Sequence, residues 1–177
     1  MVLINLEGLP LSEWDLGQLN SIVRRVGKWN RNAVTRRQLI VVTTSIAEYK
    51  RYGGRAEKQI RKQPLGYCYH VGVKDGKELK AVWLQKDMSP EMAVITAVHE
   101  LCHAYSGPTI SHEEAFRRFV TIATLSAYAE YETVLEHLDP EQWVDELCAQ
   151  YQRRNYSNPY EGERHLQAFK HYQERAK

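Results

Sequence analysis

The 177-residue chain carries His99, Glu100 and His103 in the order His-Glu-x-x-His. On a helix, residues four apart lie one turn above each other on one face, so His99 and His103 can direct two imidazoles at one metal ion. Zinc in hydrolytic sites takes three protein ligands and keeps a fourth position for water. Glu100 would project beside the ligands, where a carboxylate can accept the proton of that water. The spacing therefore predicts a zinc centre for hydrolysis, with Glu100 as its general base.

The third zinc ligand has several candidates. His112 stands nine residues after His103, at the expected start of a second helix, and a short loop can fold that start back toward the first pair. We choose His112 because two imidazole ligands need a third protein donor. Glu113, Glu114 and acids further along the chain, such as Glu130, are the alternatives.

The helix that must hold the first pair has a start and an end in the sequence. Ser89-Pro90-Glu91 is typical of a helix N-terminus, with serine as the N-cap and proline at the first helical position. Ser106-Gly107-Pro108 is expected to end the helix. Apolar residues recur at helical spacing on a different side from the histidines, at Val94, Ala97, Val98 and Leu101. We therefore expect one buried face and one face open to a cleft; the alternative is a surface helix that carries two histidines and an acid.

A small sheet is expected before this helix. Residues 39–44 are rich in β-branched side chains, and residues 66–73 and 80–85 flank a hairpin turn at Asp75-Gly76. These segments predict an α+β fold with a three-stranded sheet, antiparallel or mixed, packed on the motif helix. An edge of that sheet would form the rim of a substrate cleft, because an extended peptide can add to a sheet edge. An ordinary core sheet is the alternative.

Length and composition are typical of one soluble domain with an appendage. We expect a core over residues 1–126, which includes a helix over residues 11–27 that ends at Gly27, and a C-terminal helical extension over residues 127–177 packed on that core. No apolar run approaches the ~20 residues that cross a bilayer, so no membrane contact is expected. Three widely spaced cysteines favour a reducing, cytoplasmic environment over a disulfide framework.

Positive charge is concentrated in one segment of the chain. Residues 24–62 carry 12 Lys and Arg against 2 acids, although the formal net charge of the whole chain is only +2. Such asymmetry is typical of a polyanion partner, which makes DNA a candidate partner for this segment. A solvated basic face is the alternative.

The segment from Trp83 to Phe119 resembles the SprT-like zinc metallopeptidases, the group that includes Spartan. The likeness lies in three blocks: Met88-Ser89-Pro90-Glu91, His99-Glu100-Leu101-Cys102-His103-Ala104 and His112-Glu113-Glu114-Ala115-Phe116. In that family the last block usually reads His-Gly-x-x-Phe, and its histidine is the third zinc ligand. Here Glu113 replaces the glycine.

The resemblance implies a zincin-like fold and peptide-bond hydrolysis, with Zn²⁺ held by His99, His103 and His112. Some relatives act on proteins attached to DNA, which would suit the basic segment. Two other interpretations stay open: a DNA-binding protein whose zinc site is structural or vestigial, and a peptidase that cuts one dedicated regulator without contacting nucleic acid. Phenols that could stabilise an oxyanion, by their chemistry alone, stand at Tyr105, Tyr128 and Tyr131.

Overall fold

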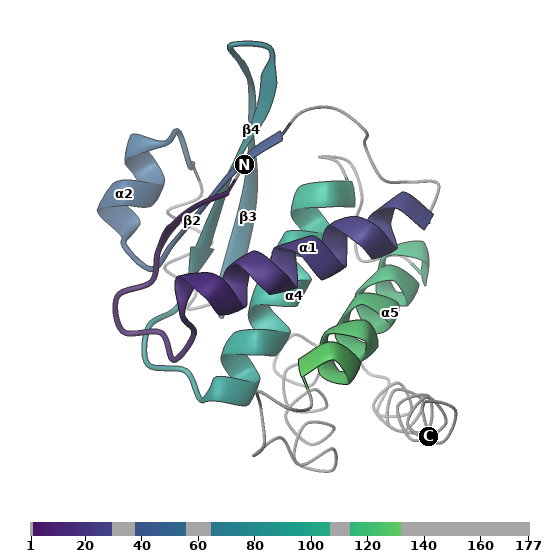
Figure 1. Ribbon diagram of the computed structural model, residues 1–177. Coiled ribbons are helices and arrows are strands. Elements are labelled where there is room, and N and C mark those ends of the chain that lie inside the picture. Colours follow the sequence, from purple (N-terminus) through teal and green to yellow (C-terminus); the bar gives the residue numbers. More distant parts are fainter. Residues whose placement is uncertain (1, 30–37, 56–64, 107–113, 132–177) are drawn as a thin grey trace. The chain divides into compact units, whose positions relative to one another are not determined.

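The computed structural model describes residues 2–29, 38–55, 65–106 and 114–131 of the chain. The chain divides into two compact units, Met1–Ala123 and Thr124–Lys177; the division expected between residues 126 and 127 stays a prediction. The described elements, in chain order, are β1 (Val2–Asn5), α1 (Glu13–Trp29), β2 (Gln38–Thr43), α2 (Ile46–Arg51), β3 (Gly66–Lys74), β4 (Lys77–Leu84), α4 (Pro90–Ser106) and α5 (Glu114–Tyr131) (Figure 1).

The four strands form one mixed sheet in the order β1-β2-β4-β3. Strands β1, β2 and β4 run parallel, and β3 runs antiparallel to β4. The sheet thus has one strand more than the three expected, because the N-terminal segment pairs with β2 from Val2 opposite Ile40 to Asn5 opposite Thr43. A four-residue apolar run is too short to show a strand period, so this strand is recognised only by its partner.

The hairpin between β3 and β4 follows the expected turn chemistry. Asp75 and Gly76 both have a positive φ, 51° and 69°, as the two central residues of a type I′ turn require. The turn makes β3 the antiparallel neighbour of β4, and β3 has no second neighbour among the described strands. Among the described strands, β3 therefore forms one edge of the sheet.

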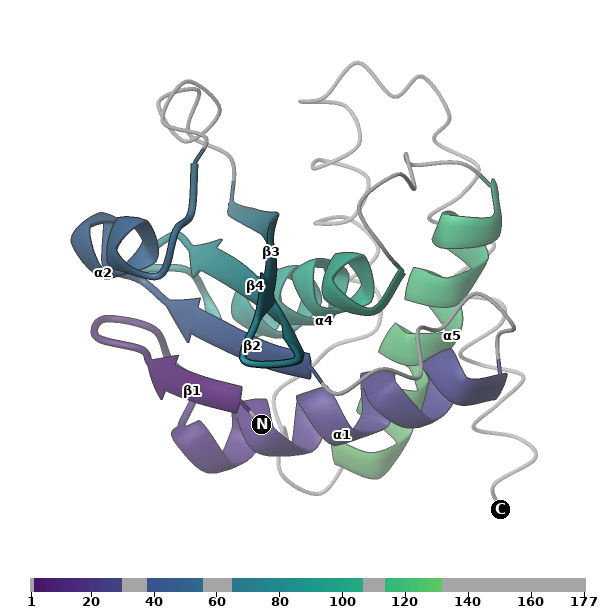
Figure 2. The same cartoon turned by 90° about the horizontal axis from the view of Figure 1, so that it is seen from above.

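Helices cover the two faces of the sheet. Helix α4 packs on β3 and β4, and α1 packs on α4. On β4, the side chain of Lys80 reaches α4, whereas the next residue, Ala81, packs with Tyr49 of α2. Since neighbouring strand residues point to opposite faces, α4 and α2 lie on opposite sides of the sheet; Figure 2 shows α2 and α1 separated by the strands.

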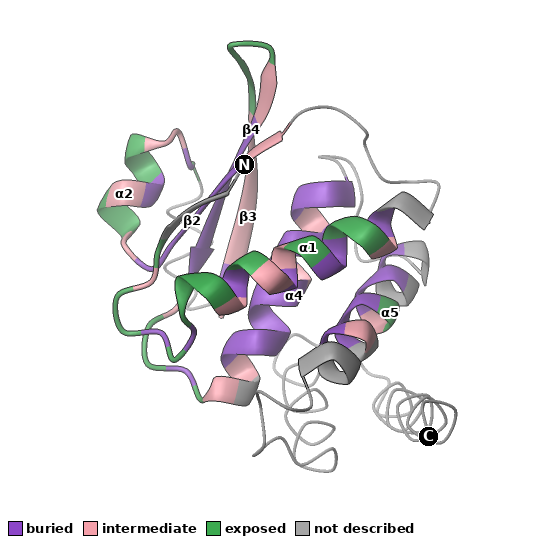
Figure 3. Cartoon of the chain, viewed as in Figure 1, coloured by how far each residue is buried: buried purple, intermediate pink, exposed green. Residues whose placement is uncertain are grey.

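Helix α4 has the expected boundaries and is buried more widely than expected. The backbone N–H of Met92 donates to the Ser89 hydroxyl at 3.3 Å, which confirms the N-cap, and the helix ends at Ser106. The predicted apolar stripe is buried, but so are Ile95 and Ala104 outside it (Figure 3). The buried surface of this helix is therefore wider than the single apolar stripe that the sequence predicted. In α1, the predicted end at Gly27 was also wrong, since the helix continues to Trp29.

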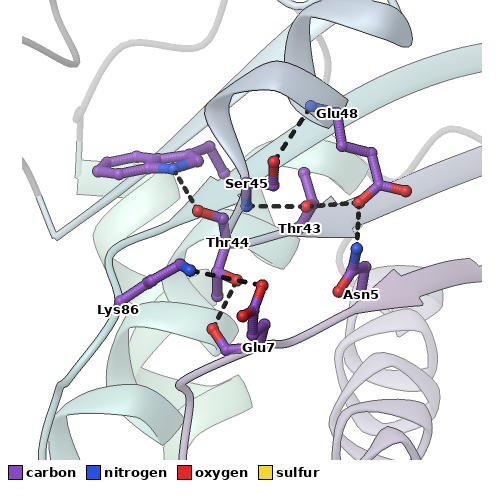
Figure 4. Close-up of polar contacts among 8 residues, drawn as sticks. Asn5, Glu7, Thr43, Thr44, Ser45, Glu48 and Lys86 are labelled. Atoms are coloured by element: carbon purple, nitrogen blue, oxygen red, sulfur yellow. Dashed lines mark hydrogen bonds and ion pairs between the residues drawn. The ribbon is translucent and has the colours of Figure 1, made fainter.

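A polar cluster fixes α2 to the carboxyl ends of β1 and β2 (Figure 4). One carboxylate oxygen of Glu48 accepts hydrogen bonds from the Asn5 amide at 2.6 Å and from the Thr43 hydroxyl at 2.9 Å. The Ser45 hydroxyl caps the helix by accepting from the Glu48 backbone N–H. Because Glu48 belongs to the helix and its partners end two strands, the cluster holds Tyr49, the next residue, over the sheet.

Candidate metal centre

The two motif histidines of α4 converge on one point. His99 and His103 are both half-buried, and their Nε2 atoms lie 3.2 Å apart, with ring centroids 4.8 Å apart and planes at 74°. A tetrahedral zinc ion bonded to two imidazole nitrogens at 2.0–2.1 Å would hold those nitrogens about 3.3 Å apart. The pair therefore fits a zinc ion, and without metal the same distance allows one ring to donate a hydrogen bond to the other.

Phe116 packs on both imidazoles. This residue lies in the first turn of α5 and is 2% exposed. Its ring stacks on His103, with centroids 4.1 Å apart and planes at 19°, and meets His99 edge-on at 5.4 Å and 84°. Phe116 stands in the third block of the family motif, but nothing in that block specifies which rings its side chain contacts.

The side chain of Glu100 on α4 is buried against the first residue of β3 and is only 3% exposed. Gly66, the first residue of β3, makes room for it: a Cβ at Gly66 would lie 2.7 Å from Glu100 Cγ and 2.8 Å from Thr96 Cγ2. Such distances are too short for non-bonded carbon atoms, so the glycine is what lets this carboxylate side chain lie against the strand. Sequence reasoning found Glu100 but missed Gly66.

Three side chains that interact electrostatically with Glu100 have raised pKa values. Burial raises the pKa of the Cys68 thiol and that of the Cys102 thiol, and the Glu100 carboxylate is a further cause in both cases. The pKa of Tyr67 is also raised, first by burial and then by Cys68 and Glu100. Since a thiolate is the reactive form of cysteine, these two thiols are poor nucleophiles at neutral pH. Both thiols and the Tyr67 phenol therefore stay protonated at neutral pH.

The C-terminal end of α4 is held by two side chains from the sheet. His70 on β3 donates its Nε2–H to the His103 carbonyl at 3.1 Å, and the Lys80 ammonium on β4 donates to the Ala104 carbonyl. The last four carbonyls of a helix have no partner within it, so both bonds satisfy groups that burial would otherwise penalise. The backbone of one predicted zinc ligand is thereby tied directly to the sheet.

Lys80 is an unusual residue for this position. It is 1% exposed, and its Nζ lies 3.5 Å from a carboxylate oxygen of Glu78. Burial lowers the pKa of Lys80, and burial together with Lys80 lowers the pKa of His70. Sequence analysis gave neither residue a role. The available signal was strand register, because Lys80 shares its face of β4 with the buried residues Val82 and Leu84.

The candidates for a third ligand lie outside what the structure describes. Among the described residues, no three His, Cys, Asp or Glu side chains are grouped to hold a metal ion. His112 and Glu113 lie outside the described residues, and the side chains of Glu114 and Glu130 are not described either. His112 therefore stays a prediction, as do its alternatives.

Tyr105, one of the candidates for oxyanion stabilisation, links two helices. Its hydroxyl donates to Asn20 Oδ1 on α1 at 2.8 Å, and its candidate role stays a prediction. The side chains of Tyr128 and Tyr131 lie outside the described residues.

The basic segment is only partly described. Arg24 and Arg25 are exposed on α1, and Lys50, Arg51 and Arg55 are exposed in and after α2. Because α1 and α2 lie on opposite faces of the sheet, these five residues do not form one continuous basic stripe.

Comparison with protein-family models, with curated proteins and with solved structures gave no match. Within the described ranges, no helix combines the length and apolar character needed to cross a membrane. The structure thus defines an α+β unit in which a His-Glu-x-x-His helix packs on a mixed sheet, with the histidine pair next to an aromatic ring and the glutamate next to an edge strand.

Proposed function

We propose that the protein is a zinc-dependent endopeptidase with a zincin-like, SprT-like core. His99, His103 and His112 hold the metal, and Glu100 is the general base. The observation that carries this proposal is the 3.2 Å distance between the two Nε2 atoms, which matches the distance between two imidazole nitrogens bound to a tetrahedral zinc ion. Glu100 follows the first ligand directly and is held in a buried, restricted position.

The contact of Phe116 supports His112 as the third ligand. Phe116 lies against both imidazoles and follows His112 by four residues. Four residues span at most about 14 Å, so residue 112 is tethered within reach of the pair. Histidine is also a ligand type that catalytic zinc commonly takes as its third donor.

Bound zinc would polarise the substrate carbonyl and make the attacking water more acidic. The Glu100 carboxylate accepts the proton of that water and then delivers it to the nitrogen of the departing amine. Gly66 lets the carboxylate lie close to β3, and the fixed end of α4 keeps the His103 backbone in place during the cycle.

The position of β3 gives the substrate a place to bind. It is an edge strand, and its first residue, Gly66, adjoins Glu100. An extended peptide that adds to a sheet edge gains main-chain hydrogen bonds without regard to its sequence. A peptide alongside β3 would therefore pass close to the proposed base.

Metal analysis and a cleavage assay test the proposal. Protein purified without chelators should contain about one zinc per chain and cleave an unfolded protein such as casein. Glu100→Gln should keep the zinc and lose roughly 10²- to 10⁴-fold in rate. Zinc-free protein, or a Glu100→Gln variant that cleaves at the wild-type rate, would rule the proposal out.

The same assay separates the possible partners. Cleavage stimulated by DNA would make DNA-associated proteins the substrate class. Salt-sensitive DNA binding without cleavage would favour a DNA-binding protein with a structural zinc site. Cleavage that DNA does not change would favour a dedicated regulator as substrate.

A further inference from the structure

One aromatic ring contacts both members of the histidine pair. Phe116 stacks on His103 at a centroid distance of 4.1 Å and contacts His99 edge-on at 5.4 Å. The ring is 2% exposed, so it fills a protein-enclosed position beside the imidazoles and is not a surface contact. Phe116 belongs to α5, whereas both histidines belong to α4.

We propose that Phe116 is a positioning residue of the metal centre: its ring holds the two imidazoles in their metal-binding orientation and raises the affinity of the pair for zinc. This inference rests on the proposed function, because it assumes that the pair binds zinc. It concerns a side chain that has no donor atom and cannot ligate the metal.

The first effect of the ring is preorganisation. The terminal torsion of a histidine side chain has broad wells, so an unconstrained imidazole samples many ring orientations. Stacking at 19° fixes the ring plane of His103, and the edge contact limits that of His99. Zinc then binds a pair whose nitrogens already lie 3.2 Å apart, and less freedom is lost on binding.

The second effect is electrostatic. The face of a phenyl ring carries partial negative charge, and it attracts cationic groups placed over it. An imidazole bonded to a divalent cation gains positive character, so the face of Phe116 favours the metal-bound form of His103. An aliphatic side chain of similar bulk would fill the space but lacks this charge distribution.

Phe119 offers a matched control within the same helix. It lies three residues further along α5 and is 3% exposed, close to the 2% of Phe116. No ring contact between Phe119 and either imidazole occurs among the described residues. Phe119→Leu therefore removes a buried phenyl ring of the same helix without changing the ring contacts of the histidines.

The test measures zinc affinity and metal-free stability separately. Zinc affinity is measured by competition with a chromophoric chelator on the full chain, and the stability of the metal-free protein by urea unfolding with EDTA. We expect Phe116→Leu to weaken zinc binding about tenfold, the size typical of outer partners of metal ligands. Phe116→Tyr, which keeps the ring, and Phe119→Leu should bind zinc within about twofold of wild type.

Two results would overturn the inference: wild-type zinc affinity in Phe116→Leu, or an equal loss of affinity in Phe119→Leu. If Phe116→Leu does not fold, Phe116→Met is measured in its place and is judged by the same two outcomes. A wild-type protein that binds no zinc would overturn the proposed function and this inference together, whereas normal zinc binding by Phe116→Leu, or by Phe116→Met in its place, would overturn the inference alone.

Discussion

The ammonium of Lys80 on β4 donates to the carbonyl of Ala104 on α4, the residue that follows the second motif histidine. Both partners are buried, at 1% and 0% exposure. A buried cation is costly unless it is paired, and here Glu78 and the end of a helix supply the compensating negative charge. The helical turn that carries His103 is thus anchored to the sheet by one of the most deeply buried charges of the described chain.

Removing this anchor should destabilise the fold. Lys80→Met keeps the aliphatic stem but leaves the Ala104 carbonyl without its donor, which should cost about 1–3 kcal/mol of unfolding free energy. Urea unfolding of the metal-free protein measures the loss. Lys74→Met, at an exposed position of the same hairpin, is the control and should stay within about 0.5 kcal/mol of wild type. Equal stabilities of the two variants would show that the Lys80 bond contributes nothing.

A side chain at position 66 should impair catalysis and spare metal binding. Gly66→Ala places a Cβ 2.7 Å from Glu100 Cγ, so the carboxylate must shift. A displacement of about 1 Å at a catalytic group can cost on the order of 10²-fold in rate. Casein cleavage and zinc content are measured together. Gly17→Ala, where an added Cβ meets nothing within 4 Å, is the control. Undiminished cleavage by Gly66→Ala would contradict the position assigned to the base.

Two tyrosines should respond differently to loss of their hydroxyl. Tyr49 Oη is buried without a hydrogen-bond partner among the described residues, whereas the Tyr105 hydroxyl donates to Asn20. At neutral pH, Tyr49→Phe should leave the unfolding free energy unchanged or raise it, because an unpaired buried hydroxyl stabilises nothing. Tyr105→Phe should lower it by about 0.5–1.5 kcal/mol. If Tyr49→Phe lowered the unfolding free energy as much as Tyr105→Phe, the prediction would be wrong.

Tyr49 should also contribute to alkaline unfolding. Burial raises the pKa of Tyr49 above its ordinary value of 10.0, so the folded state keeps the proton that the unfolded state releases. Below pH 10 the phenol is protonated in both states, and as the pH rises above 10 its ionisation in the unfolded state lowers the unfolding free energy. Wild type should therefore lose more unfolding free energy than Tyr49→Phe between pH 7.5 and pH 10.5. Parallel losses in the two proteins would exclude a contribution from this phenol.

Removal of zinc should lower the stability of the whole first unit. A ligand that binds only the folded state stabilises it by about 2.7 kcal/mol at 100 times its Kd. Thermal unfolding with added zinc and with EDTA should therefore differ in Tm for wild type. His103→Ala should abolish the difference, because one of the two convergent nitrogens is lost. A zinc-dependent Tm that persists in His103→Ala would place the metal elsewhere.

Short-range patterns of the sequence predicted several local features of the structure. The serine cap and proline before residue 91 predicted where α4 begins, and the four-residue spacing predicted that His99 and His103 share a face. Asp75-Gly76 predicted the hairpin turn, and the β-branched run predicted β2. Each of these depends on interactions within about one helical turn or one turn of chain, which residue types encode directly.

Tertiary structure alone decided what surrounds the histidine pair. It made β3 an edge strand, buried Lys80 and His70 against α4, and brought Phe116 onto both imidazoles. The bonds of Lys80 and His70 join residues 24 and 33 positions apart. Such contacts follow from how whole elements pack, because the same lysine or histidine would point to the opposite face of the sheet, away from α4, if the strand paired one residue out of register.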